Sequence, residues 1–131
     1  MEPARGRPLR VLVIDDDPAA CALVRDMLVR LGHVATTSAD GLAGLEAYRA
    51  GDFDVVVTDV FMPEQGGFET IGELRRIDPR VRVIAISGGG RHEESGDVLT
   101  LAVRLGAKAT LQKPFGLKDL ERALFGVIEF G

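Results

Sequence analysis

Five short apolar runs, each followed by a segment with helical punctuation, constrain the fold of this chain most strongly. The runs are rich in β-branched residues and lie at residues 10–14, 34–37, 54–58, 81–86 and 108–111. The first, third and fourth are nearly continuous in Val, Leu and Ile, which is typical of strands covered on both faces. The strict alternation of strand and helix predicts an α/β fold, with a parallel sheet between two layers of helices.

The segments between the runs carry helix start and stop signals. Asp17 before Pro18 suits an N-cap followed by the first helical residue, and Gly32 ends the apolar periodicity of the first helix. Residues 40–50 and 68–77 repeat this pattern. Two further helices are expected after the fourth and fifth runs, the last of them with an apolar end that either completes the core or forms a surface for dimerisation or effector binding.

Length and composition limit the class of protein. A chain of 131 residues with 27% charged residues fits one soluble domain, which we expect at residues 9–131 after a flexible leader at residues 1–8. No apolar stretch approaches the roughly 18 residues that span a bilayer, and the single cysteine, Cys21, suits the reducing cytoplasm. A formal net charge of −4 argues against a nucleic-acid platform. We therefore expect a cytoplasmic protein that binds neither membrane nor nucleic acid directly.

Polar residues stand at the ends of four of the predicted strands. In an open α/β sheet, ligands bind beyond the carboxyl ends of the strands, so these residues should converge on one edge. They are, in chain order, Asp15, Asp16, Asp17, Asp59, Ser87 and Lys113. Taken singly, each has a simpler explanation as a cap, a turn residue or a solvated charge. Their expected convergence favours a functional site.

The chemistry of this set points to phosphoryl transfer. Crowded carboxylates repel one another, and Mg²⁺ offsets that repulsion because it prefers carboxylate, carbonyl and water oxygens. Asp59 could then attack phosphorus as a carboxylate nucleophile and form an aspartyl-phosphate. Ser87 and Lys113 would supply donors to the oxygens of the transferred group. Mg²⁺ is therefore the predicted cofactor.

Four segments carry a resemblance to a known family. The stretches VLVIDDDP, VVVTDVFMP with the following glycines, VIAISG and LGAKATLQKPF occur in this order. With them the chain resembles, over about residues 9–124, the receiver domains of two-component response regulators. The resemblance implies a three-layer, doubly wound sheet of flavodoxin-like strand order 2-1-3-4-5. It also implies a stand-alone phosphoacceptor switch, which is not an enzyme beyond catalysing its own phosphorylation and dephosphorylation.

The resemblance further implies roles for individual residues. Asp59 would be the phosphoacceptor and a metal ligand, and Asp16 the principal acidic ligand of Mg²⁺. Asp15 would contact the metal or hold its water, and Phe61 would contribute its backbone carbonyl. Ser87 and Lys113 would contact the phosphoryl group. The Lys113–Pro114 bond is expected to be cis, since an ordered X–Pro turn can hold that isomer.

The switch departs from the family pattern at one position. Three residues before Lys113, where receivers commonly carry Tyr or Phe, this chain has Thr110. We expect the signal to travel instead from Ser87 and Gly88 through a long mobile loop at residues 88–96. His92 is expected to be a solvated residue of that loop. The change would reach the face made by the fourth helix, fifth strand and fifth helix.

The partners implied by the resemblance are other signalling proteins. The phosphoryl donor would be a sensor histidine kinase or a histidine phosphotransfer protein, and the recipient of the signal an effector protein. A phosphorylation-dependent homodimer stays open. The sequence names neither the cognate kinase nor the effector.

Three alternatives remain open at this stage. An aspartate-dependent phosphohydrolase of the haloacid-dehalogenase type would use Asp15 and Asp17 as its Asp-x-Asp motif, but would leave Asp59 and the residues after it unexplained. A flavodoxin-like electron carrier would need a Ser-, Thr- and Gly-rich loop where this chain has Asp-Asp-Asp-Pro. A degenerate receiver that only binds partners would lack one of the acidic or lysine positions, and none is missing.

Overall fold

A parallel sheet forms the centre of the molecule. The computed structural model describes residues 7–61, 66–88 and 92–130. Within them the strands pair in parallel in the order β2-β1-β3-β4-β5, as expected. The elements follow one another as β1 (Arg10–Ile14), α1 (Pro18–Arg30), β2 (Val34–Ser38), α2 (Gly41–Ala50), β3 (Val55–Asp59), α3 (Gly67–Ile77), β4 (Val83–Ser87), α4 (His92–Leu105), β5 (Ala109–Gln112) and α5 (Leu117–Phe130).

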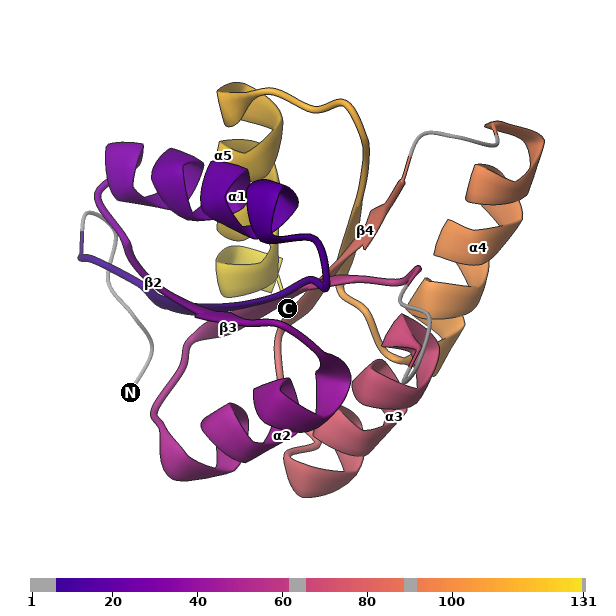
Figure 1. Ribbon diagram of the computed structural model, residues 1–131, viewed down its shortest axis with the longest axis horizontal. Helices are drawn as coiled ribbons and strands as arrows, with labels where there is room; N and C mark the ends of the chain where they lie inside the picture. The colour runs from indigo at the N-terminus through magenta and orange to yellow at the C-terminus, as the bar shows by residue number, and fades with distance from the viewer. Residues whose placement is uncertain (1–6, 62–65, 89–91, 131) are drawn as a thin grey trace.

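Helices cover both faces of this sheet (Figure 1). Helices α1 and α5 lie together on one face, and α2, α3 and α4 cover the other. Successive strand residues point to opposite faces, so Val11 and Val13 pack with α1 and α5, while Leu12 and Ile14 pack with α2 and α3. All four side chains are at most 1% exposed. Burial on both faces explains the nearly unbroken apolar run of β1 and confirms the three-layer prediction.

The predicted boundaries of the strands are close to those observed. Strand β1 has the predicted bounds, and the ends of the other strands differ by no more than two residues. Helix α1 begins at Pro18, and the Asp17 carboxylate accepts a hydrogen bond from the Ala19 amide at 3.0 Å. This contact confirms the predicted N-cap.

The loop predicted at residues 88–96 is wrong in its second half. Helix α4 already begins at His92, so His92 belongs to a helix. The physical reason lies in the sequence: Glu93 and Glu94 are good helix formers, and acidic residues are favoured in the first turn, near the positive end of the helix dipole. Residues 89–91, like residues 1–6 of the predicted leader, lie outside the described residues.

A polar contact joins α2 to the end of α3 at the amino edge of the sheet. The Tyr48 hydroxyl donates to an Asp78 carboxylate oxygen at 2.7 Å, and the Tyr48 ring stacks on Phe53 with 6.3 Å between centroids. Burial and the hydrogen bond to Asp78 strongly raise the pKa of Tyr48. The hydrogen bond between Tyr48 and Asp78 therefore ties α2 to the end of α3 at the edge of the sheet opposite the carboxyl ends of the strands.

None of the helices in the described part of the chain combines the length and apolar composition needed to cross a lipid bilayer.

Candidate functional site

The register of the sheet brings the carboxyl ends of its central strands level with one another. Ile14 of β1 pairs with Thr58 of β3, so Asp15 and Asp59 follow at the same height. Asp59 in turn pairs with Ile86 of β4, the residue before Ser87. The Lys113 amide donates to the Ser87 carbonyl at 2.9 Å, which draws the residue after β5 to the same edge. The predicted polar residues thus converge, as the strand order requires.

Three carboxylates form a cluster at this edge. One oxygen each of Asp15, Asp16 and Asp59 lies within 4.8 Å of the other two. Asp15 and Asp59 are buried, at 3% and 6% exposure, while Asp16 is exposed. Backbone amides orient the buried pair: the Asp17 amide donates to Asp15 at 2.9 Å, and the Phe61 amide donates to Asp59 at 3.2 Å. Asp15 and Asp59 are therefore buried and held by backbone amides, whereas Asp16 faces solvent.

The electrostatics of the cluster favour a bound cation. Burial, and then the neighbouring charge of Asp15, raise the pKa of Asp59 to about 6. The Phe61 amide and the Lys113 ammonium group act in the opposite direction and only partly compensate. The Lys113 nitrogen lies 3.5 Å from an Asp15 carboxylate oxygen. One lysine therefore faces three acids, and the excess negative charge remains.

The residues fit Mg²⁺. The three carboxylate oxygens lie within 4.8 Å of one another, near enough for Asp15, Asp16 and Asp59 to hold one small divalent cation together. The cluster offers only oxygen ligands, and exposed Asp16 leaves one side open to water. Both features match the preference of Mg²⁺ for carboxylate oxygens and retained waters.

The hydroxyl and lysine expected beside Asp59 lie on neighbouring strands. Ser87 is fully buried at the end of β4, and its hydroxyl donates to the Gly88 carbonyl at 3.3 Å. The Lys113–Pro114 bond is cis, which confirms that prediction. Thr110 lies within β5, opposite Ala85 in register, and lines a hollow against α5. Because residue 110 is Thr, this position has no aromatic ring that could move on activation.

Asp17 and Phe61 differ from the rest of the predicted set. The Asp17 carboxylate caps α1 and does not belong to the acidic cluster, which leaves the Asp15–Asp17 motif of a phosphohydrolase without its second carboxylate. Phe61 is 45% exposed, and its side chain faces away from the core. Its amide contacts Asp59, so its backbone lies beside the acidic cluster whatever its side chain does.

Gly67 is a supporting residue that the sequence analysis did not single out. A Cβ at this position would overlap the Asp59 carbonyl oxygen and the Val60 Cα atom, so the first turn of α3 packs directly on the backbone at the end of β3. The signal available in the sequence was the Gly66-Gly67 pair before an amphipathic helix. That signal could not say which backbone the glycine would meet.

Comparisons with known proteins agree on one family. The family model described as the response regulator receiver domain matches residues 11–125. The chain is 32% identical to the chemotaxis protein CheY of Thermotoga maritima, over 88% of this chain and 93% of that protein. It is 34% identical to the transcriptional regulator NtrC of Azospirillum brasilense, over 87% of this chain but only 24% of that protein.

Solved structures give the same result. A response regulator receiver domain protein from Clostridium thermocellum is 30% identical, with a TM-score of 0.81, and covers 92% of this chain and 94% of its own. The chemotaxis protein CheY4 of Vibrio cholerae is 27% identical, with a TM-score of 0.82 over 92% of this chain.

Proposed function

Because this chain belongs to the response regulator receiver domain family, we propose that it is a phosphoacceptor switch in which the Asp59 carboxylate takes up a phosphoryl group. One observation carries the proposal: three carboxylate oxygens lie within 4.8 Å of one another at the carboxyl edge of the sheet, with the Lys113 nitrogen 3.5 Å from one of these residues. This arrangement supplies a nucleophile, a set of metal ligands and a counter-charge in one place.

The residues of the chain divide the chemistry among them. An Asp59 oxygen forms a bond to phosphorus while the bond from phosphorus to the donor breaks, and the donor leaves with those electrons. Asp15, Asp16, Asp59 and the Phe61 carbonyl would hold Mg²⁺, which, when bound, neutralises charge on the transferred oxygens. Lys113 would pair with the phosphoryl group, and the Ser87 hydroxyl would turn from the Gly88 carbonyl to donate to it.

Asp59 must be ionised to act as the nucleophile. With its pKa raised to about 6, most of the Asp59 population is charged at neutral pH but little is charged at pH 5. A cation beside it would favour the charged form and lower that pKa. Phosphorylation should therefore depend on Mg²⁺, and with Mg²⁺ bound it should persist to a pH below the Asp59 pKa of about 6.

The switch would run from Ser87 into α4. Rotation of the Ser87 hydroxyl toward the phosphoryl group removes its bond to Gly88, the residue that leads out of β4. Thr110 cannot perform an aromatic ring movement, so we propose that the change passes through residues 88–91 and α4 to the face of α4, β5 and α5. Hydrogen exchange of residues 88–96 should change on addition of a phosphoryl mimic such as beryllofluoride. Unchanged exchange there would refute this route.

The partners follow from the proposed chemistry. A phosphoryl donor must present a phosphohistidine to the acidic edge, so we propose a cytoplasmic sensor histidine kinase or histidine phosphotransfer protein. The changed face would be recognised by an effector protein or by a second copy of the chain.

Intact-mass measurement with acetyl phosphate tests the function directly. The wild-type chain should gain the mass of one phosphoryl group in the presence of Mg²⁺, and should gain none after Mg²⁺ removal with EDTA. The Asp59→Asn variant should gain none under either condition. The matched control is Asp17→Asn, which removes an equally charged neighbour that caps α1 and should leave the gain in place.

Two results would contradict the proposal. A gain that persists in Asp59→Asn would place the acceptor elsewhere, and its loss in Asp15→Asn together with Asp17→Asn would favour a phosphohydrolase. Absence of any gain, with acetyl phosphate and with a histidine kinase, would indicate a receiver that only binds partners.

A further inference from the structure

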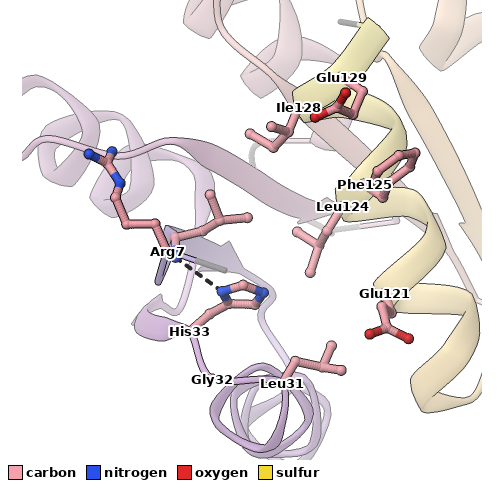
Figure 2. A pocket seen from close by; sticks show the side chains of 10 residues that line it. Arg7, Leu31, Gly32, His33, Glu121, Leu124, Phe125, Ile128 and Glu129 are labelled. Atoms are coloured by element: carbon pink, nitrogen blue, oxygen red, sulfur yellow. Dashed lines mark hydrogen bonds between the residues drawn. The ribbon is translucent and has the colours of Figure 1, made fainter. Parts of the chain in front are cut away.

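A hollow lined by Arg7, His33 and residues of α5, drawn in Figure 2, lies at the amino edge of the sheet. Asp59 stands at the opposite, carboxyl edge. The hollow has a volume of about 310 Å³ and lies between the residues before β1, the turn from α1 to β2, and the second half of α5. This size is at the lower end of small-molecule sites in proteins. Its apolar walls come from all three segments and are formed by Leu9, Leu31, Leu124, Phe125 and Ile128.

His33 presents one hydrogen-bond donor to this hollow. The Leu9 amide donates to the Nδ1 atom of His33 at 3.0 Å, so Nδ1 carries no proton. The ring proton of the neutral imidazole must then be on Nε2, which Figure 2 shows turned toward α5. Burial lowers the pKa of His33, and a proton on Nδ1 would oppose the Leu9 amide. His33 therefore stays neutral at physiological pH.

The charged groups around the hollow have an excess of negative charge. Glu121 and Glu129 extend from α5, and Arg7 stands on the opposite wall (Figure 2). In the described part of the chain, neither carboxylate has a cationic partner within 4.0 Å. Glu121 is also close enough for its charge to act on His33. With His33 neutral, the described residues that line the hollow sum to one net negative charge, so a cation is favoured over an anion.

We propose that this hollow is a binding site for a small organic amine with an aromatic or branched apolar body. The apolar body would pack on Leu124, Phe125 and Ile128, and the ammonium group would pair with Glu121. Among the described residues the Nε2–H of His33 has no hydrogen-bond partner, so it can donate to a hydroxyl or carbonyl oxygen on the ligand, which would distinguish amines that carry such a group. The site shares no residue with the acidic cluster, so both can be occupied at once.

Proton NMR of the two histidines provides the test. The chain has two histidines, and His92 begins α4, whereas His33 faces the hollow. Titration of the full chain at pH 7.5 with 2-phenylethylamine should shift the His33 C2 proton in a saturable manner and leave that of His92 in place. The dissociation constant should be on the order of 1 mM for so small a ligand.

Matched probes and variants make the result specific. 3-Phenylpropionate has a similar body and the opposite charge, and it should bind less well than the amine. Glu121→Gln should weaken amine binding about threefold, as expected for one exposed ion pair. Glu46→Gln makes the same change on an exposed part of α2 and should have no effect.

Each contrary outcome has a definite meaning. Absence of a saturable His33 shift, or equal binding of amine and carboxylate, would refute the proposal. Preferential binding of the carboxylate would indicate an anion site made by Arg7 and His33 and would equally refute it. Asp59→Asn should retain amine binding, so failure of phosphorylation and failure of this site are separate results.

Discussion

Replacement of Asp59 by Asn should stabilise the metal-free protein at neutral pH. The pKa of Asp59 is raised from 3.8 to about 6 in the folded protein, so the native state holds this proton more tightly than the unfolded state. At neutral pH the folded protein therefore holds Asp59 in its ionised form, although folding favours the protonated form of this carboxyl group. At 1.36 kcal/mol per pKa unit, the free energy of unfolding falls by about 3 kcal/mol over the whole titration, and about 2.4 kcal/mol of that fall lies between pH 4 and pH 7. Asn keeps the shape and an acceptor for the Phe61 amide but has no charge.

Urea unfolding followed by circular dichroism measures this difference, since the chain has no Trp to report by fluorescence. At pH 7.5 in EDTA, Asp59→Asn should gain about 3 kcal/mol over wild type, a shift in the urea midpoint of about 1.5 M for a slope of about 2 kcal/mol/M. At pH 4 the gain should nearly vanish, because Asp59 is then protonated in the native protein and about half protonated in the unfolded chain. Added Mg²⁺ should also narrow the gap by stabilising only the wild type.

The control for Asp59→Asn is the same substitution at an exposed aspartate. Asp26→Asn makes the same substitution on the exposed face of α1, beside Arg25, and should change the free energy of unfolding by no more than about 0.5 kcal/mol. A gain for Asp59→Asn that is absent at pH 7.5, or equal at pH 4 and pH 7.5, would show that burial and the Asp15 charge do not govern this carboxylate.

Three further predictions concern the scaffold. Gly67→Ala should destabilise the fold by about 1–3 kcal/mol and slow phosphorylation from acetyl phosphate. Its control, Gly72→Ala, lies in open space on the same helix and should be neutral or stabilising by up to about 1 kcal/mol. Equal urea midpoints for the two variants would contradict the packing of Gly67 on β3. Tyr48→Phe should lose about 1 kcal/mol with its hydrogen bond, and no loss in urea unfolding would show that the bond contributes nothing. The lowered pKa of His33 means that the unfolded chain binds the imidazole proton more tightly, so the free energy of unfolding should fall as pH drops below about 6.5. This fall should be measured in the Asp59→Asn background, which removes the opposite trend of Asp59, and it should flatten when His33→Gln is added. An unchanged slope would contradict a neutral His33.

Much of the architecture could be predicted because its signals are local. The alternation of apolar runs and capped helical segments depends on residues near one another in the chain, and α1 begins at Pro18 for that reason. The convergence of Asp15, Asp59 and Lys113 was also predictable, since parallel strands end at a common edge once their order is known. The second half of the loop at residues 88–96 was predicted wrongly because the glycines were given more weight than Glu93 and Glu94.

Other features depend on contacts between distant residues and could not be derived from the sequence alone. Crowding of the acids predicts that at least one of them has a raised pKa, but only the structure identifies Asp59 as that group. The tight fit of Gly67 against the Asp59 backbone and the bond from the Leu9 amide to His33 likewise depend on segments that are distant in the chain. The positions of strands and helices and the capping of α1 were determined by the sequence through local preferences and apolar periodicity, whereas the strand order was implied by the resemblance to receiver domains. Only tertiary packing decided the desolvation of Asp59, the distances within the acidic cluster and the shape of the hollow beside His33, because each depends on atoms that are brought together from distant parts of the chain.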